Sequence, residues 1–450
     1  MSTLLGARAQ MGTSLAFHII LAALGVGLPI LLFAAEGLYL RTGDKDWLTL
    51  AKRWSKAFGI LFAIGAVSGT MLSFELGLLW PTFMRFSGSI IGLPFALEGF
   101  AFFVEAIFVG LYLYGWERLS PRVHWLCSIP LMVSGTLSAW FVVSANSWMN
   151  TPAGFLYKNG KVSSIDPIGA ILNPSTGYET THMIFASYMA TGFGVAALLA
   201  LGILRGRKER WLRQGLLLAL GLGFIAAPIQ IVIGDIAARS VASNQPAKFA
   251  AMEALYRTQK SPPITILGFP NDAAQHTTLG IEIPHALGIL VNGDPNATVK
   301  GLNAFAPQDR PTSLLVHPFF DMMVGTGFAT LAAGAWFWFL WWRSKRTVPE
   351  GRWLMRALVA AGPLTFMAIE FGWMVTEEGR QPWIIQGILR TSQAVTTAPG
   401  VNLTFAVFSA IYIALGVTSV ILLRRLDDQP DPAANDRIAE KPLIAGGVTR

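Results

Sequence analysis

Long apolar stretches alternate with polar connections along most of this chain. Nine of these stretches are long enough to form spanning helices, which need about 20 predominantly apolar residues each. They cover roughly 14–40, 55–79, 93–116, 124–146, 180–204, 214–236, 318–342, 354–376 and 401–423. Backbone groups inside a bilayer must bond within the segment. The pattern therefore predicts an all-α integral membrane protein with about nine transmembrane helices.

Two connections are longer than the others. The first covers about 147–179. The second covers about 237–317, is rich in Pro, Asn and Asp, and contains no spanning stretch. We predict one transmembrane domain over 1–426 that includes the second connection as a long loop between helices six and seven. The segment 427–450 is polar and contains Pro and Ala, so we predict a disordered tail.

Composition excludes a soluble protein and several kinds of site. Hydrophobic residues make up 53% of the chain and charged residues 13%, whereas a soluble domain carries about 25% charged residues. The net charge of +8 comes from Lys and Arg spread over short connections, so it does not indicate nucleic-acid binding. The single cysteine, Cys127, excludes an intrachain disulfide, an iron–sulfur cluster and a Cys-x-x-Cys-His heme attachment.

Lys and Arg are concentrated in alternate connections. The connections after the first, third, fifth and seventh spans carry most of them, and Arg424 and Arg425 follow the ninth span. Such residues accumulate on the cytoplasmic side of a membrane. We therefore predict that the N-terminus and both long connections lie outside and that the C-terminus is cytoplasmic.

Ionisable side chains lie inside several predicted spans, where they are costly and usually functional. His18 is in the first span, and His182 is about one turn inside the outer face in the fifth. Glu98 and Glu105 in the third span are seven residues apart, which places them on nearly one helix face, about 10 Å apart along the axis. Such a pair can pass protons; two protonated core carboxyls are the structural alternative. His124 and His317 are expected to be interfacial.

Two more positions near the outer face suggest heme chemistry. Met323 lies at the depth of His182, and a His/Met iron site carries electrons without binding oxygen. Glu377 is followed by Arg380 and preceded one turn earlier by Trp373. A carboxylate, a guanidinium and an indole together suit a heme. The alternative interpretation is a capped helix C-terminus with an interfacial tryptophan.

Seven segments that contain these residues or flank them occur in order along the chain. They are ARAQMGTSLAFHII, KAFGILFAIGAVSGTMLSFELG, ALEGFAFFVEAIFVGLYLYGW, LSAWFVVSANSWMNTP, PAKFAAMEA, IPHALGI and GRQPW. Together they resemble subunit I of the cytochrome bd-type quinol oxidases over nearly the whole chain. GRQPW is the signature pentapeptide of that family. The loop of about 80 residues between helices six and seven resembles the short-loop branch.

The resemblance implies three hemes. His182 and Met323 would be the axial ligands of a low-spin heme b near the outer face. His18 and Glu377 would be ligands of two high-spin hemes, one heme b and one heme d or third heme b. Some relatives carry an Arg two residues before the Met ligand, where this chain has Asp321.

The same resemblance implies a terminal respiratory oxidase subunit of the bacterial cytoplasmic (inner) membrane, which oxidises quinol outside and reduces dioxygen to water. Glu98 and Glu105 would form a proton path from the cytoplasm, although some relatives space these acids by eight residues. Lys248 and Glu253 in the outer loop would bind or oxidise ubiquinol or menaquinol. Other positions that match residues near the hemes or the proton route are Lys56, Ser138, Asn146, Trp373 and Arg380.

The implied partners are a second membrane subunit and an accessory single-span subunit, with no nucleic acid. Two other classes of protein stay open. One is a heme-b electron-transfer subunit without oxygen chemistry, although His18 and His182 are too few for two bis-His hemes. The other is a proton-coupled transporter that uses Glu98 and Glu105. It is disfavoured by the lack of an internal repeat.

Overall fold

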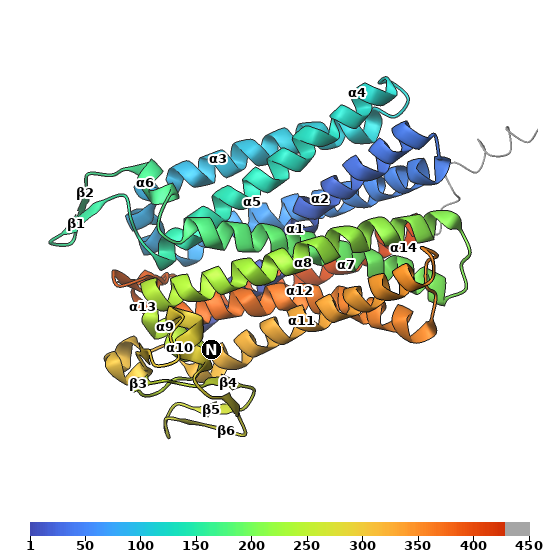
Figure 1. Ribbon diagram of the computed structural model, residues 1–450. Helices are drawn as coiled ribbons and strands as arrows, with labels where there is room; N and C mark the ends of the chain where they lie inside the picture. The colour runs from blue at the N-terminus through green and yellow to red at the C-terminus, as the bar shows by residue number, and fades with distance from the viewer. Residues whose placement is uncertain (428–450) are drawn as a thin grey trace, which may run out of the picture.

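The structure, a computed structural model, describes residues 1–427 and is an elongated bundle of long helices (Figure 1). Nine segments of this described part are helical, long and apolar enough to cross a membrane. Their helices are α1 (Thr3–Thr42), α2 (Lys45–Leu79), α3 (Pro81–Tyr114), α4 (Pro121–Leu126) with α5 (Ser128–Asn150), α7 (Thr176–Leu204), α8 (Arg210–Asn244), α11 (Ser313–Arg343), α12 (Arg352–Arg380) and α14 (Val401–Asp427). The predicted fold class is confirmed. The predicted disordered tail lies, apart from Asp427, outside the described residues.

Several helices extend beyond the apolar stretches that predicted them. α3 begins at Pro81 rather than near residue 93, with proline in its first turn, where its missing N–H costs nothing. α8 continues to Asn244 rather than ending near residue 236. Its added turns carry an ion pair between Arg239 and Asp235, four residues apart on the helix. The long loop therefore starts after Asn244, and the shorter one covers 151–175.

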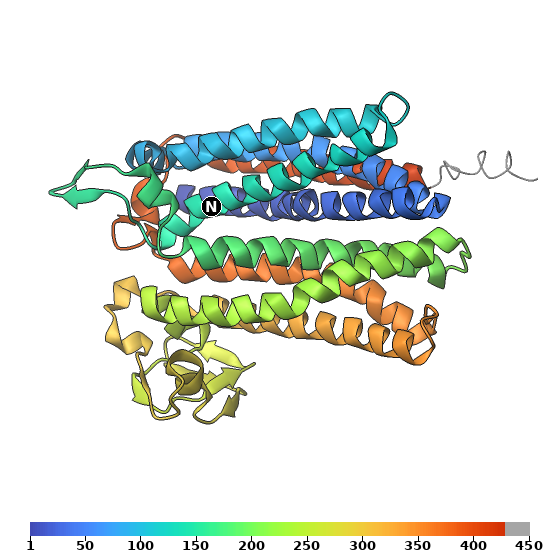
Figure 2. The ribbon, with the colours of Figure 1, turned by 45° about the horizontal axis from the view of Figure 1, so that its top comes forward.

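The two ends of the bundle carry different segments (Figures 1 and 2). One end, called the loop end below, carries the hairpin of β1 (Leu156–Lys158) and β2 (Lys161–Ser163), α6 (Pro167–Ile171), the long loop and α13 (Thr391–Ala394). The opposite end carries the connections that follow α1, α3, α7 and α11, and the last turn of α14. The connections rich in Lys and Arg all lie at this opposite end, which agrees with the predicted alternation.

The long loop is compact, although its sequence contains no spanning stretch. It contains α9 (Pro246–Met252) and α10 (Ala286–Asn292). Three short antiparallel pairs follow: β3 (Gln259–Lys260) with β8 (Thr298–Val299), β4 (Ile264–Ile266) with β7 (Ile281–Ile283), and β5 (Phe269–Asn271) with β6 (His276–Thr278). Apolar side chains from α9, α10 and β8 pack together inside it, namely Phe249, Leu255, Leu287 and Val299. A small core of its own holds the loop against the bundle.

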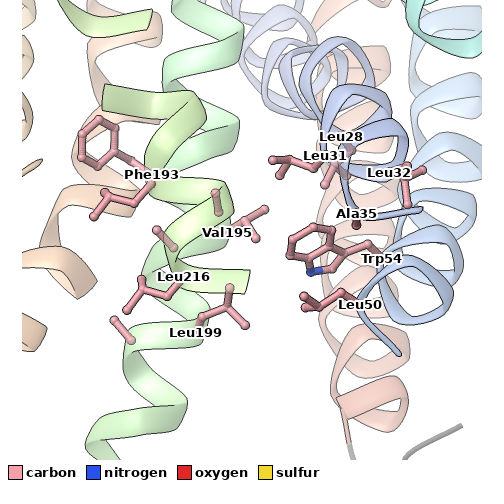
Figure 3. Close-up of a cluster of buried hydrophobic side chains, with 14 of the residues drawn as sticks. Leu28, Leu31, Leu32, Ala35, Leu50, Trp54, Phe193, Val195, Leu199 and Leu216 are labelled. Carbon is pink, nitrogen blue, oxygen red and sulfur yellow. The ribbon is translucent and has the colours of Figure 1, made fainter. Parts of the chain in front are cut away.

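The largest buried apolar cluster joins the first two helices to the middle of the bundle. Figure 3 shows side chains of α1 and α2 facing those of α7 and α8, namely Leu28, Leu31, Leu32, Ala35, Leu50, Trp54, Phe193, Val195, Leu199 and Leu216. A Cβ on Gly192 of α7 would overlap the backbone of Gly223 of α8. Glycines permit this close approach of helices in membranes. α7 is thereby held at the centre, in contact with α1, α5, α8 and α12.

Candidate functional site

A buried group of polar side chains lies at the loop end, where α12 ends. Arg380 is 2% exposed and forms an ion pair with Glu377 one turn earlier on the same helix. Its Nη1 also donates to Asn150 Oδ1 of α5 at 3.1 Å. Asn146, one turn before Asn150, donates from Nδ2 to Glu377 Oε1 at 2.8 Å. Both carboxylate oxygens of Glu377 thus accept hydrogen bonds, which fix its orientation.

Lys248 of α9 belongs to this same group. Its Nζ donates to Asn150 Oδ1 at 3.0 Å, and Asn150 Nδ2 donates to Glu179 Oε1 of α7 at 2.9 Å. Lys248 is 5% exposed. Burial lowers the pKa of its ammonium group to about 7, while the nearby Glu179 acts in the opposite direction. The structure therefore places Lys248, a residue of the long loop, against the end of α12.

Glu253, the other loop residue singled out from the sequence, lies in a different environment. It is 3% exposed, directly after α9. Burial raises the pKa of its carboxyl to about 8, and repulsion from Asp321 of α11 adds to that effect. Lys248 and Glu253 therefore face different groups, Lys248 the end of α12 and Glu253 the start of α11.

His317 of α11 holds the loop to the bundle and is fully buried rather than interfacial as expected. Its Nδ1 lies 2.7 Å from the carbonyl oxygen of Met252, and its Nε2 lies 3.1 Å from that of Leu267. Both ring nitrogens therefore lie within hydrogen-bond distance of carbonyl oxygens of the loop. Asp321 Oδ2 lies 3.4 Å from Nε2 and accepts from the Leu267 N–H at 2.5 Å. Asp321 thus contacts both His317 and the loop backbone.

The ring of His18 on α1 is oriented by α2. Its Nδ1 lies 2.9 Å from Ser68 Oγ, and that hydroxyl donates to the carbonyl oxygen of Gly65 at 3.0 Å. The hydroxyl has one proton, so Nδ1 must donate to it, which leaves the lone pair on Nε2 available. A Cβ on Gly69 would lie only 2.9 Å from His18 Cε1. The α2 backbone therefore packs directly against the imidazole.

His182 of α7 and Met323 of α11 each face a glycine on a neighbouring helix. His182 Nδ1 is sealed from solvent without a hydrogen-bond partner among the described residues. Its Cε1 lies 3.7 Å from the Cβ position of Gly234 on α8. Met323 Sδ lies 3.1 Å from the Cβ position of Gly372 on α12. Glycines thus leave room beside both side chains predicted to bind low-spin iron.

The two carboxyls of α3 both face α5. Glu105 is 5% exposed, and its Oε1 lies 3.2 Å from the Cβ position of Gly135. Glu98, two turns nearer the loop end, accepts from Ser138 Oγ at 3.3 Å.

Lys56, which the resemblance placed near the hemes or the proton route, is exposed on α2.

Comparisons with known proteins agree on one family. The sequence model of the family described as cytochrome bd terminal oxidase subunit I matches residues 6–430 of this chain. A putative cytochrome bd menaquinol oxidase subunit I of Bacillus subtilis is 37% identical over 94% of this chain and 96% of its own. The subunit 1 of cytochrome bd ubiquinol oxidase from the same species is 31% identical over 94% and 93%. The solved bd oxidase of Geobacillus thermodenitrificans superposes with a TM-score of 0.89 at 36% identity, covering 94% of this chain and 98% of that one.

The chain belongs to the cytochrome bd terminal oxidase subunit I family. As a cytochrome bd subunit I, it is a quinol:oxygen oxidoreductase and a multi-pass protein of the bacterial inner membrane. Membership also implies heme cofactors, a quinol substrate and a second subunit. The resemblance inferred from the sequence segments is thereby confirmed. Membership of this family excludes the alternative that the protein is a proton-coupled transporter.

The residues present in this cytochrome bd subunit fit heme iron. His18 Nε2 is available to bind iron because His18 Nδ1 is hydrogen-bonded to Ser68 Oγ. His182 Nδ1 is buried without a hydrogen-bond partner among residues 1–427, and a neutral imidazole nitrogen is the commonest protein ligand of metals. Met323 supplies a thioether beside a glycine, and Glu377 supplies a carboxylate held by two donors. This donor set matches the imidazole, thioether and carboxylate ligands expected for three hemes.

Two buried polar groups were missed from the sequence. Glu75 of α2, with no exposed surface, accepts from Gln10 Nε2 at 3.2 Å and Ser14 Oγ at 2.8 Å. Glu36 of α1 contacts His124, which is 2% exposed and not solvated as expected. Both glutamates lie inside predicted spans, so the criterion applied to Glu98 and Glu105 would have found them.

We expect Ser68→Ala to disturb the heme that His18 is predicted to bind. The ring would lose the hydrogen bond that sets its orientation, and loss of such an outer partner typically costs about 10–100-fold in affinity for the bound metal. Heme content and the high-spin absorption of the purified complex measure the effect. Ser73→Ala is the matched control, since that hydroxyl is exposed and bonds only the Gly69 carbonyl oxygen. Equal heme content in both variants would show that Ser68 does not orient the ligand.

Proposed function

We propose that this subunit oxidises quinol at the loop end and uses the electrons to reduce dioxygen to water with protons drawn from the opposite end. The bound hemes would supply electron transfer and the oxygen-binding iron. The protein would supply the ligands, the proton donors and the exclusion of water. Charge would then cross the membrane without a pump, because the two half-reactions take and release protons on opposite sides.

We assign the heme ligands as the resemblance implies. His182 and Met323 would hold the low-spin heme b, supported by the unsatisfied His182 nitrogen and the glycines opposite both side chains. His18 and Glu377 would hold the two high-spin hemes, one of type b and one of type b or d. Trp373, one turn before Glu377, packs with Ile369 beside α1 and α7, which suits an aromatic wall for a macrocycle.

The observation that carries the proposal is the position of α5. Its Ser138 donates to Glu98 on α3, and its Asn146 donates to Glu377 on α12. Ser138 and Asn146 are eight residues apart, about two turns of one helix. One helix therefore contacts both the predicted proton carboxyls and the predicted iron ligand. In this assignment Glu105 receives protons from the opposite end and Glu98 passes them along α5 toward Glu377.

Arg380 and Lys248 would balance the negative charge at the end of that route. Both donate to the Asn150 oxygen, and the two cations lie beside the two anions Glu377 and Glu179. Buried charges are stable only when paired and hydrogen-bonded. Lys248 would then affect quinol oxidation through this charge balance, whereas Glu253 would accept a proton from quinol.

We expect quinol oxidation to depend on pH through Glu253. A carboxyl with its pKa raised to about 8 is mostly protonated at pH 7, and only the ionised form accepts a proton. Turnover with quinol should therefore rise as pH increases toward 8, by up to about tenfold per pH unit well below the pKa. Glu253→Gln should remove this rise and lower turnover roughly 10²-fold. Oxygen consumption by the purified complex, measured from pH 6 to 9, tests this.

Two controls separate quinol oxidation from the rest of the reaction. Glu282→Gln changes an exposed carboxylate on β7 of the same loop and should leave turnover unchanged. An artificial donor that bypasses the loop should support normal oxygen consumption in Glu253→Gln. Loss of activity with both donors would place the role of Glu253 outside quinol oxidation. A wild-type pH profile in Glu253→Gln would move the proton acceptor elsewhere.

A further inference from the structure

A groove opens at the end of the bundle opposite the long loop, between the last turns of α1 and the short helix α4. Its volume is ≈ 330 Å³, within the range of ligand-sized pockets. It is lined by Gly37, Leu40, Arg41, Arg122, Trp125 and Leu126. None of these residues contributes to the heme, proton or quinol sites assigned above. The groove combines two guanidinium groups with an apolar wall.

A buried hydrogen-bond network holds the elements that line the groove together. His124 of α4 lies with Nδ1 2.7 Å from Glu36 Oε1 and Nε2 2.9 Å from the Tyr112 carbonyl oxygen. The Tyr112 hydroxyl donates to Glu36 Oε2 at 2.6 Å. On the groove side, Trp125 Nε1 donates to the Phe33 carbonyl oxygen at 3.0 Å, and the two rings stack. α4 is therefore fixed to α1 and α3, and the groove is preformed.

The positive charge in the groove has no carboxylate partner within the described part of the chain. Arg41 and Arg122 are both exposed, and within residues 1–427 neither guanidinium forms an ion pair with a carboxylate. The acid nearest to Arg41 in sequence, Asp44, forms an ion pair with Arg210 at 2.9 Å. Glu36 is turned inward and is occupied by His124 and Tyr112. Two guanidinium groups that share one groove favour an anionic ligand, and a phosphate accepts their paired N–H donors.

The remaining surface of the groove is apolar and suits a membrane. Leu126 is 49% exposed, and Val123 beside it is 48% exposed, so α4 presents aliphatic side chains next to the arginines. Trp125 has the place of an interfacial tryptophan, at the level where headgroups meet acyl chains. This end of the bundle also carries the Lys- and Arg-rich connections. Basic pockets between transmembrane helices on the cytoplasmic side suit anionic headgroups.

We propose that this groove binds an anionic phospholipid, with the headgroup phosphate between Arg41 and Arg122 and an acyl chain along Val123 and Leu126. A zwitterionic lipid would bring an ammonium group toward two cations. Free phosphate would leave the apolar wall uncovered. The groove therefore selects a lipid that has both a net negative headgroup and hydrocarbon chains.

Native mass spectrometry of the detergent-solubilised complex with its second subunit tests the proposal. Wild-type complex is titrated with phosphatidylglycerol, with phosphatidylcholine or with glycerol phosphate. We expect one tight phosphatidylglycerol and no comparable binding of the other two. The double variant Arg41→Gln, Arg122→Gln should weaken phosphatidylglycerol binding roughly thirtyfold, since each arginine near a headgroup contributes about fivefold. Heme content confirms that the variant is folded.

Arg118→Gln is the matched control, because Arg118 is an exposed cation in the adjacent connection that does not line the groove. It should keep wild-type lipid affinity. Equal phosphatidylglycerol binding in the double variant and the control would overturn the proposal. Equal affinity for glycerol phosphate would also overturn it and define an anion site. Loss of the second subunit from the double variant, without a change in lipid binding, would assign the groove to that subunit instead.

Discussion

Replacing His182 by alanine is expected to abolish the low-spin heme band of the purified enzyme. The His182 imidazole would supply one strong-field ligand to that iron, and Met323 is the second ligand that we assign. Met323→Leu should remove the sharp low-spin band and leave a five-coordinate or altered heme, because only the thioether is lost. Reduced-minus-oxidised absorption spectra measure both changes. Signals from the two high-spin hemes should persist in each variant.

Each variant has a neighbour that serves as a control. Met322→Leu changes a methionine whose side chain is 42% exposed and should leave the spectrum intact. Met183 lies beside His182 in the sequence and packs against a small apolar cluster. Met183→Leu should therefore also keep the low-spin band. An unchanged low-spin band in both His182→Ala and Met323→Leu would remove the assignment. His317 cannot replace them as a ligand in this structure, since both its nitrogens are taken up by carbonyl oxygens.

Glu105→Gln is expected to lower quinol-driven oxygen consumption by at least about 10²-fold, as is typical when a proton-transferring group is removed. Glutamine keeps the shape of the side chain but cannot ionise. The site is 5% exposed and packed against Gly135, so no solvent replaces the missing carboxyl. The low-spin heme should still be reduced by quinol, because we assign electron entry to the loop end.

Glu117→Gln provides the comparison for Glu105→Gln. Glu117 is an exposed carboxylate just beyond the end of α3, and its removal should leave turnover near the wild-type value. Turnover near wild type in Glu105→Gln would show that the α3 carboxyls are only structural. Slow turnover together with slow reduction of the low-spin heme would place the defect in electron entry rather than in proton supply.

Most of the fold follows from the apolar pattern because a bilayer imposes one strong constraint, the length of an apolar helix. The nine spans, the alternation of Lys and Arg and the two loops were all predictable in this way. The ends of the helices were not predictable from the apolar pattern, since a helix continues through polar turns outside the bilayer when local contacts favour it. The ion pair of Arg239 with Asp235 illustrates this for α8. The compact loop was not predictable either, because its strands are three residues or shorter.

The candidate site was predicted less evenly. His18, His182, Glu98, Glu105 and Glu377 stand out because ionisable groups are rare within apolar helices. The position of Lys248 could not be read from the chain. It depends on α9 folding back so that one amide, Asn150, accepts from both Lys248 and Arg380. This contact among α5, α9 and α12 depends on tertiary structure, so residue spacing within any one helix cannot predict it.

The carbon monoxide difference spectrum of the reduced, purified complex tests the central claim most directly. The account predicts that the protein contains heme and that one reduced heme binds the gas, because oxygen reduction requires an open iron position. Heme without any response to carbon monoxide would contradict the account and indicate electron transfer without oxygen chemistry. A complex with no heme at all would contradict every ligand assigned to His18, His182, Met323 and Glu377.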